Sequence, residues 1–377
     1  MLFDIELSDP LVMGIALVFS FSFLVQLFYY WFFFSRLAFH RQKPFQSTDH
    51  QVSVVICARN EYYNLERNLP IILEQDYPDF EVVVVNDCSD DDTFYLLNDM
   101  AEKYKNLKIV NINQTLNFFS GKKFPLSIGI KSAKNELLLL TDADCNPRSR
   151  QWIRQMQSQF DNKTEIVLGY GGYECIKGLL NKLIRYDTLQ VAMQYLSLAK
   201  AGLPYMGVGR NLAYRKSLFY KNNGFISHYR IQSGDDDLFI NRVAHRKNTR
   251  VEVSLHSHTI SVAKTSFRDW MRQKKRHLST GRYYKTRHKI VLGLFSSTRF
   301  LFFLTLAWLL CSGFNYYVVL LALLLRMISQ LIITRHCMKQ LSEKQFLFLT
   351  PIFEIFLFFT NATAGFLTIF SRKQVWK

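Results

Sequence analysis

The sequence predicts an α/β domain with a mostly parallel sheet, flanked by transmembrane helices. Long uncharged apolar runs lie near both ends of the 377-residue chain, and in the middle short β-branched runs alternate with amphipathic stretches. Continuous apolar strands that alternate with helices are typical of a parallel sheet covered on both faces. The apolar content excludes a disordered chain, the length excludes a small disulfide-stapled domain, and the unbroken apolar runs argue against a transmembrane barrel.

The first apolar run, residues 11–34, is uncharged. It can cross a hydrocarbon core of about 30 Å, which takes about 20 helical residues. Acidic residues such as Asp9 precede it, which favours an uncleaved anchor over a signal peptide. Basic residues, including Arg36 and Arg41, follow it, and such residues stay on the cytoplasmic side. We therefore expect residues 1–40 to anchor the chain in the cell (plasma or inner) membrane, with the middle of the chain in the cytoplasm.

The C-terminal part, residues 291–377, is expected to hold the remaining transmembrane helices. Three apolar segments lie there, with the turn sequence CSGFN between the first two: residues 292–311, 316–333 and 346–370. Polar residues interrupt the third segment, and if all three crossed, the basic tail would end outside, against the positive-inside rule. The number of crossings therefore stays open at three or four, with a re-entrant or interfacial third segment as the alternative.

Two ionisable residues, Arg326 and Glu354, are expected at membrane depth. Such groups usually face a polar path or a partner. Two interpretations stay open: a functional polar path, and a structural pair or an Arg326 side chain that reaches to the interface.

The polar middle begins near residue 50 and repeats a strand–helix pattern. Short apolar runs predict buried strands, and apolar residues at helical spacing predict the helices between them. The expected strands are residues 52–57, 81–86, 107–111 and 136–141, and the expected helices are residues 64–73, 93–104 and 126–133. In sheets of this kind, ligands bind beyond the carboxyl ends of the strands.

Acidic residues follow three of these strands at their carboxyl ends. Glu61 follows the first strand, Asp87 the second, and Asp142 with Asp144 the fourth. Carboxylates at one edge repel one another unless a cation lies among them, and Mg²⁺ binds one or two carboxylates together with substrate phosphates. The alternative is that such residues only cap helices or shape turns. Agreement among three loops favours a divalent-cation site with a pyrophosphate ligand.

The runs SVVICARNE, EVVVVNDCSDDDT and GKKFPLSIGIKSAKNELLLLTDADC, in this order, resemble those of the family 2 glycosyltransferases. The similarity continues through GVGRNLAYRKSLF, SGDDDLFINRV and WMRQKKRHLSTG, so that it covers about residues 50–285. The resemblance implies an inverting enzyme that uses a nucleotide-sugar donor, with the GT-A fold in residues 50–263. The flanking helices match the membrane-embedded branch of that family.

The resemblance also implies which residues hold the donor. Asp87 matches the second member of an acidic pair that reads uracil, which implies a UDP-linked donor, although Asn86 replaces the first member. The Asp-x-Asp motif, Asp142 and Asp144, implies a divalent cation, Mg²⁺ or Mn²⁺, and contact of Asp142 with the donor. The implied donor-binding residues are Cys57, Arg59, Glu61, Asp87, Lys122 and Asp142.

The catalytic base is implied to lie in the run GDDD, where the family patterns favour Asp236, with Asp235 as second choice. This run could instead form a helix N-terminus. Gln273 and Arg276 match a family motif that lies near the acceptor and the diphosphate, but His277 stands where processive members carry Trp.

Residues 264–290 form a strongly basic segment with interleaved aromatic residues. Next to membrane helices, such a segment is expected to lie on an anionic membrane surface, with its aromatic rings at headgroup depth. Nucleic-acid binding is the generic alternative for basic–aromatic runs. The adjacent apolar helices argue against that alternative, so no nucleic-acid partner is expected.

These expectations together describe a membrane glycosyltransferase that moves one sugar from a nucleotide-sugar to a lipid-linked or membrane-proximal glycan acceptor. Inverting transfer needs a base for the acceptor hydroxyl and stabilisation of the leaving diphosphate, for which Asp236 and the cation site are the candidates. Two alternatives remain: a processive polysaccharide synthase, favoured by Gln273 and Arg276, and a catalytically silent membrane scaffold.

Overall fold

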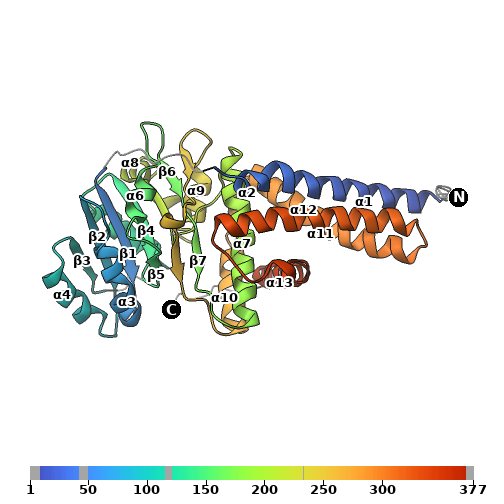
Figure 1. Cartoon of the computed structure of the whole chain (residues 1–377). Coiled ribbons are helices and arrows are strands. Elements are labelled where there is room, and N and C mark those ends of the chain that lie inside the picture. The colour runs from blue at the N-terminus through green and yellow to red at the C-terminus, as the bar shows by residue number, and fades with distance from the viewer. Residues whose placement is uncertain (1–8, 42–49, 115–120, 232, 371–377) are drawn as a thin grey trace.

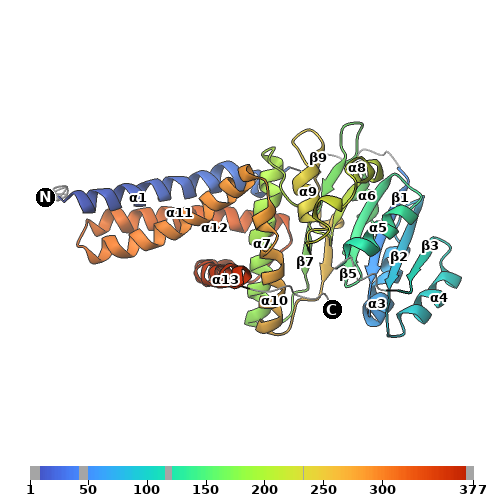
Figure 2. The same cartoon turned by 180° about the vertical axis from the view of Figure 1, so that it is seen from behind.

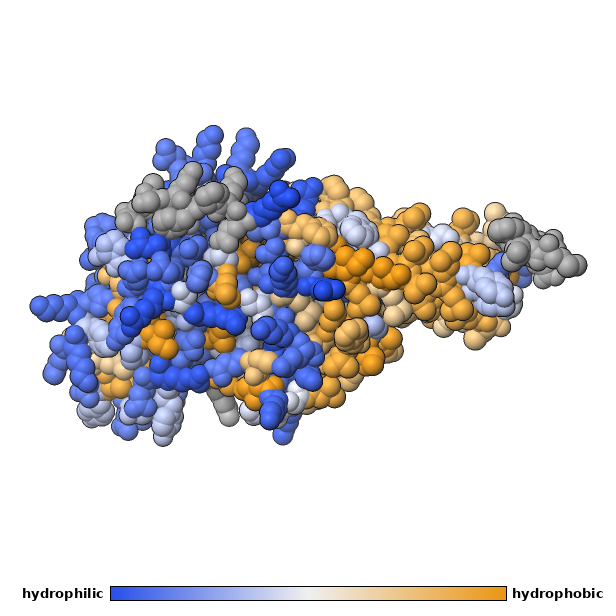
Figure 3. Space-filling view, viewed as in Figure 1, coloured by the Kyte–Doolittle hydropathy of each residue, from blue (hydrophilic) through white to orange (hydrophobic). Residues whose placement is uncertain are grey.

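The computed structural model of the chain joins an α/β domain to a bundle of long helices (Figure 1). It describes residues 9–41, 50–114, 121–231 and 233–370, with side chains as far as residue 365. The bundle extends to one side of the domain, and the N-terminal helix begins at its far tip (Figures 1 and 2). On the face shown in Figure 3, the surface of the bundle is mostly hydrophobic, whereas that of the domain is mostly hydrophilic.

A seven-stranded sheet with the order β3-β2-β1-β4-β8-β6-β9 forms the centre of the domain. Strands β3, β2, β1 and β4 are parallel and β8 is antiparallel to its neighbours, so the sheet is mostly parallel, as predicted. The strands are β1 (Val52–Ala58), β2 (Phe80–Asp87), β3 (Leu107–Ile112), β4 (Leu137–Asp142), β6 (Ile166–Leu168), β8 (Leu212–Arg215) and β9 (Thr249–Val251). The four strands expected from the sequence are confirmed to within one residue at each end.

Helices cover both faces of this sheet. Val55 of β1 packs in a core cluster with residues of α5 and α7, whereas its neighbours Val54 and Ile56 pack with residues of α3 and α6. Because both faces are buried, the strands consist of continuous apolar residues. The helices of the domain are α3 (Tyr62–Leu73), α4 (Thr93–Lys103), α5 (Lys123–Ser132), α6 (Trp152–Gln157), α7 (Leu179–Lys200), α8 (Lys216–Lys221) and α9 (Asp237–Val243).

A small second sheet and an amphipathic helix connect the domain to the bundle. The sheet has the order β5-β10-β7, with β5 (Cys145–Pro147), β10 (Thr259–Ser261) and β7 (Gly171–Tyr173). Helix α10 (Phe267–Leu278) follows β10 and buries Trp270. The Lys274 ammonium on α10 donates to Asp187 of α7 at 2.6 Å. The basic segment of residues 264–290 therefore comprises α10, a 3₁₀ turn and the first turn of the next helix.

Four helices are long and apolar enough to cross a membrane, which fits an integral membrane protein. The first comprises α1 (Pro10–Phe28), a π-helical turn (Tyr29–Phe34) and α2 (Ser35–Ala38), and the others are α11 (Thr286–Cys311), α12 (Tyr316–Gln340) and α13 (Thr350–Phe370). Helices α11 and α12 extend beyond the apolar runs that predicted them, because their polar ends continue as helix next to the domain. Which membrane the helices cross, and on which side the domain lies, stay predictions.

The two ionisable residues expected at membrane depth contact each other. The Arg326 guanidinium donates to both carboxylate oxygens of Glu354, at 2.6 and 3.1 Å, and Gln330 donates to the same carboxylate at 3.0 Å. The side chains of Arg326 and Glu354 are 1% and 3% exposed. The pairing that the structural interpretation expected is therefore present, and a functional polar path stays an open alternative.

Candidate active site

The carboxyl ends of β1, β2 and β4 meet at one edge of the sheet, which we call the carboxyl edge. Parallel pairing places Cys57 of β1 next to Asp142 of β4, and Ala58 of β1 next to Asn86 of β2. The loops that follow β1, β2 and β4 are far apart in the sequence, but they therefore begin next to one another. The functional side chains expected from the sequence extend from these loops.

A lysine and an aspartate form an ion pair at the carboxyl edge. Lys122, which precedes α5, contacts the carboxylate of Asp142. Burial raises the pKa of Asp142, but the cations Lys122, Arg210 and Arg276 outweigh this effect and hold the pKa below its usual value. Burial and the negative charge of Asp142 raise the pKa of Asp144. A bound cation would stabilise such a pair of carboxylates.

The residues of the Asp-x-Asp motif fit a hard divalent cation. Asp142, Asp144 and Cys145 each provide one ligand atom within 4.8 Å of the others. Burial raises the pKa of the Cys145 thiol well above its usual value, and its Sγ donates to Asp144 at 3.3 Å, so the sulfur is a protonated neighbour of the site. Mg²⁺ and Mn²⁺ favour oxygen ligands, and Asp142 with Asp144 would hold the ion.

The remaining residues of the expected donor site also lie at the carboxyl edge. Burial raises the pKa of Cys57 to about 12, so its thiol is neutral and lies in the field of four charged side chains: Lys122, Asp235, Asp142 and Asp87. Burial raises the pKa of Asp87 and the nearby Arg59 guanidinium lowers it. Glu61 accepts a hydrogen bond from Asn64 at 2.5 Å, and burial raises its pKa. Segments far apart in the sequence thus converge around Cys57.

Asp236 immediately precedes α9 and accepts two backbone hydrogen bonds. The N–H groups of Gly209 and Asp237 each donate to one of its carboxylate oxygens at 2.7 Å. Burial, followed by the charges of Asp235 and Asp237, raises the pKa of Asp236 to about 8. Asp236 therefore does cap α9, as the alternative interpretation of the GDDD run expected. Its raised pKa also suits a general base at neutral pH.

Helix α10 carries two of the expected residues. Gln273 donates to the Tyr173 hydroxyl at 3.2 Å. The Nε of Arg276 is buried and makes no hydrogen bond within the described part of the chain, while the charge of this guanidinium lowers the pKa of Asp142. A buried guanidinium nitrogen that lacks a partner is costly, and an anionic ligand would satisfy it.

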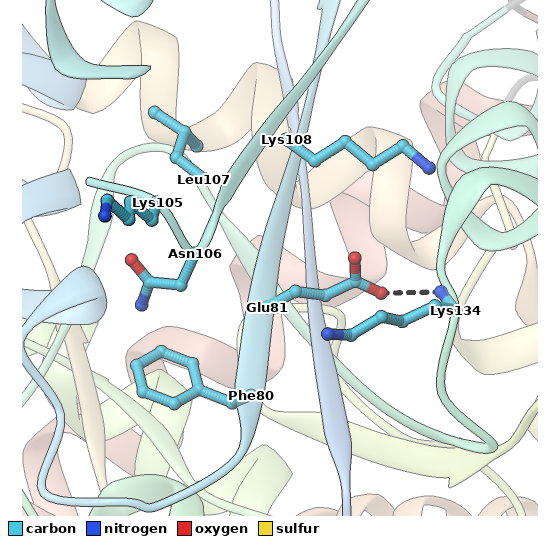
Figure 4. A pocket seen from close by; sticks show the side chains of 7 residues that line it. All are labelled: Phe80, Glu81, Lys105, Asn106, Leu107, Lys108 and Lys134. Atoms are coloured by element: carbon cyan, nitrogen blue, oxygen red, sulfur yellow. Dashed lines mark hydrogen bonds between the residues drawn. The ribbon is translucent and has the colours of Figure 1, made fainter. Parts of the chain in front are cut away.

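A cavity of about 280 Å³ lies at the opposite edge of the sheet (Figure 4). Phe80 at the start of β2 and Leu107 at the start of β3 line it, together with the lysines Lys105, Lys108 and Lys134. Since these strands are parallel and begin here, the cavity is separated from the carboxyl edge by the length of the sheet. The residues that line this cavity are therefore not those of the candidate active site at the carboxyl edge.

Two family models match the chain over overlapping stretches. Residues 53–222 match the model described as glycosyl transferase family 2, and residues 150–334 match the one described as glycosyl transferase family group 2. The chain belongs to glycosyl transferase family 2. The resemblance seen in the sequence motifs is thereby confirmed.

Curated relatives of this glycosyltransferase include two Bacillus proteins. The probable glycosyltransferase YdaM of Bacillus subtilis is 28% identical over 186 residues, which are 46% of this chain and 43% of the relative. The poly(ribitol-phosphate) beta-glucosyltransferase of Bacillus spizizenii is 26% identical over 207 residues, which are 54% of this chain and 31% of the relative. The match thus spans less than half the length of each relative.

A solved structure shares the fold of this glycosyltransferase. The mannosyltransferase PcManGT of Pyrobaculum calidifontis, determined with GDP-Man and Mn²⁺, superposes with a TM-score of 0.58 and 20% sequence identity, covering 88% of this chain and 99% of that chain. At this identity the likeness concerns the fold, and it confirms the expected GT-A architecture with a mostly parallel central sheet.

Three residues around the site were not assigned a role from the sequence. Arg210 donates to the Gly172 carbonyl at 3.2 Å, stacks over Tyr173 and acts electrostatically on both carboxylates of the Asp-x-Asp motif. Asp237 accepts hydrogen bonds from Thr280 and, at 2.7 Å, from Tyr284, and Lys123 binds the carbonyls before Gly234. The glycines of GVGRN were the available signal for Arg210, because chain that approaches a site closely often needs glycine. Asp237 and Lys123 had no such signal, because their roles depend on contacts with residues far away in the sequence.

Proposed function

We propose that this glycosyltransferase moves a sugar from a nucleotide-sugar, with a UDP-linked donor as first choice, to a lipid-linked or membrane-proximal glycan acceptor. The observation that carries the proposal is the charge arrangement at the carboxyl edge. Two adjacent carboxylates, Asp142 and Asp144, lie among the cations Lys122, Arg210 and Arg276. Such an arrangement suits a metal–diphosphate group better than it suits either ion alone.

We assign the proton transfer to Asp236. In an inverting displacement, the acceptor oxygen forms a bond to the anomeric carbon as the bond to the diphosphate oxygen breaks, and the acceptor proton must leave. The Asp236 carboxylate would take that proton, since two backbone N–H groups fix its position and its pKa of about 8 gives it basicity near neutral pH. A positioned base contributes about 10²–10⁴-fold to such a reaction.

The leaving diphosphate would be stabilised by cations of this chain. Arg276 brings a buried Nε without a partner among the described residues, and Lys122 brings an ammonium that now pairs with Asp142. Mg²⁺ or Mn²⁺ held by Asp142 and Asp144 would neutralise further charge on the diphosphate. The Mn²⁺ and GDP-Man bound by the mannosyltransferase of the same fold support this choice of cofactor and donor class.

The experiment is a nucleotide-release and sugar-transfer assay in native membranes, with a panel of UDP- and GDP-linked sugars, with Mn²⁺ or with EDTA. We expect donor turnover that needs the metal, and product length distinguishes a single transfer from processive synthesis. Asp236→Asn should keep donor binding, because the donor contacts are elsewhere, but lower transfer by about 10²–10⁴-fold.

The matched control is Asp90→Asn, an acidic residue that follows β2 but is exposed. It should leave turnover close to that of the native protein. Metal-independent turnover, or full activity of Asp236→Asn, would contradict the proposal, and absence of any donor turnover would favour a silent scaffold.

A further inference from the structure

Helix α13 is oriented differently from the other three long apolar helices. In both views α1, α11 and α12 lie in the plane of the picture, whereas α13 is seen end-on (Figures 1 and 2). Its axis is therefore roughly perpendicular to the bundle. If the bundle crosses the bilayer, a helix perpendicular to it lies in the plane of the membrane.

The packing partners of α13 belong mainly to the part of the molecule that adjoins the α/β domain. It crosses α10, which lies in the plane of both pictures, and also contacts α7 (Figures 1 and 2). Helix α10 exposes Arg268 and Arg272, and charges of this kind lie at headgroup depth and not in hydrocarbon. A helix that packs against α10 on the side of the bundle therefore lies next to the headgroup depth of those arginines.

The face of α13 that is turned away from these partners is apolar and exposed. Phe348, just before the helix, is 89% exposed, Ile352 is 64% exposed and Phe359 is 62% exposed. These residues recur at helical spacing, together with Ile355, and form one stripe. The hydrophobic surface of the bundle continues toward the domain over the place where α13 lies (Figure 3). The stripe thus continues the surface that faces lipid.

Side-chain contacts attach α13 to the bundle in this orientation. Glu354 accepts from Arg326 of α12 at 2.6 Å and lies 4.0 Å from Arg299 of α11. Phe358 stacks on Phe300 of α11, with ring centroids 5.3 Å apart. The helix is therefore fixed against both the bundle and α10, and it lies in the angle between them.

We propose that α13 lies along the bilayer surface on the same side as the α/β domain, with the Phe348–Phe359 stripe buried among the lipid acyl chains. The bilayer is then crossed by the α1–α2 helix, α11 and α12. An in-plane α13 does not carry the chain across the bilayer, so the basic residues that follow it in the sequence, Arg372 and Lys373, obey the positive-inside rule that a fourth crossing would break. The inference does not depend on the proposed function.

The test uses the full chain with Lys377→Cys and a membrane-impermeant maleimide, with modified sites read by mass spectrometry. Two native cysteines are internal controls. Exposed Cys311 is the last residue of α11, which ends at the far tip of the bundle (Figure 1), and exposed Cys175 follows β7 of the domain. The maleimide reaches one side of intact vesicles at once and the other side only after the vesicles are permeabilised. We expect the cysteine at 377 to react in the same one of these two conditions as Cys175. Reaction together with Cys311 instead would overturn the proposal.

A depth measurement gives an independent answer. Nitroxide labels are placed in full-length protein at Ile352→Cys or Thr363→Cys, with Cys175 and Cys311 replaced by serine, in bilayers of phosphatidylcholine and phosphatidylglycerol. These positions lie on one face and are about 16 Å apart along a helix. Equal depths for the two labels support an in-plane helix, whereas depths that differ by about 16 Å mean that α13 crosses the membrane and overturn the proposal.

Discussion

Asp236 shows how neighbouring groups tune a single carboxyl. It has two backbone donors, which favour the charged form, yet burial and the charges of Asp235 and Asp237 raise its pKa to about 8. The unfolded chain would release this proton near pH 4. Between about pH 4 and pH 8 the folded state therefore binds the extra proton, so this group lowers the stability of the fold as the pH rises. The protein retains a costly charge where the proposed reaction needs a base.

The pH–rate profile should follow the ionisation of Asp236. A base must be deprotonated, so kcat/KM should rise about tenfold per pH unit below pH 8 and level off above it. Asp235→Asn removes a charge that raises this pKa, and it should shift the rising limb to lower pH. Initial rates between pH 6 and pH 10 test this, and a flat profile, or complete loss of activity in Asp235→Asn, would move the role of base away from Asp236.

Arg276 should contribute through its charge on the donor diphosphate. Hydrogen bonds to charged groups are worth about 1.5–3 kcal/mol, so Arg276→Ala should lower kcat/KM about 10- to 100-fold. Arg272→Ala is the matched control on the same helix, since Arg272 is exposed and bonds Asp269 at 3.1 Å. Steady-state kinetics of both variants check the difference, and equal effects would mean that α10 is merely destabilised.

At the scale of elements, the structure ties the proposed base to the membrane-proximal segment. Asp237, at the start of α9, accepts hydrogen bonds from Thr280 and Tyr284, which follow α10. Lys123, at the start of α5, binds the carbonyls of Ile231 and Ser233 from the other side. Helix α10 thus lies between the candidate site and α13. A shift of α10 would therefore move residues of the site and also change the packing of α13.

Removing only one member of the Arg326–Glu354 ion pair, which attaches α13 to α12, should destabilise the protein more than removing both. Glu354→Leu leaves Arg326 buried without its carboxylate, which should cost about 3–5 kcal/mol and lower the apparent Tm in detergent. The double variant Arg326→Leu with Glu354→Leu removes both charges and should recover most of that loss. Thermal unfolding of the two variants decides, and a single variant as stable as the native protein would show that the pair contributes little.

At the scale of the whole molecule, two separately built parts meet along α7 and α10. The α/β domain provides the carboxyl edge, and the bundle of long apolar helices extends from its side (Figure 1). Because α10 carries Gln273 and Arg276 and also packs on α13, the candidate site lies about one helix diameter, ~10 Å, from the proposed lipid surface. That distance is suitable for an acceptor carried by a lipid.

Donor and metal together should stabilise the folded protein more than either one alone. A ligand that binds only the folded state at 100 times its Kd adds about 2.7 kcal/mol. Thermal shifts in detergent with UDP- or GDP-sugars, each with and without Mn²⁺, should therefore show the largest rise for one nucleotide with the metal. Asp144→Asn, which removes one metal ligand but keeps the size of the side chain, should abolish the extra shift. An equal shift in that variant would exclude Asp144 as a ligand.

The sequence by itself determined the strands, the apolar helices and the acidic residues at the strand ends. These features depend on local periodicity and composition, so Val52–Ala58 and Asp142 could be placed without coordinates. Only the tertiary structure decided which distant groups meet: the pairing of Arg326 with Glu354, the position of Arg210 beside the Asp-x-Asp motif, and the orientation of α13. Burial, the electric field at a side chain and the direction of a helix arise from segments far apart in the chain, and no local pattern encodes them.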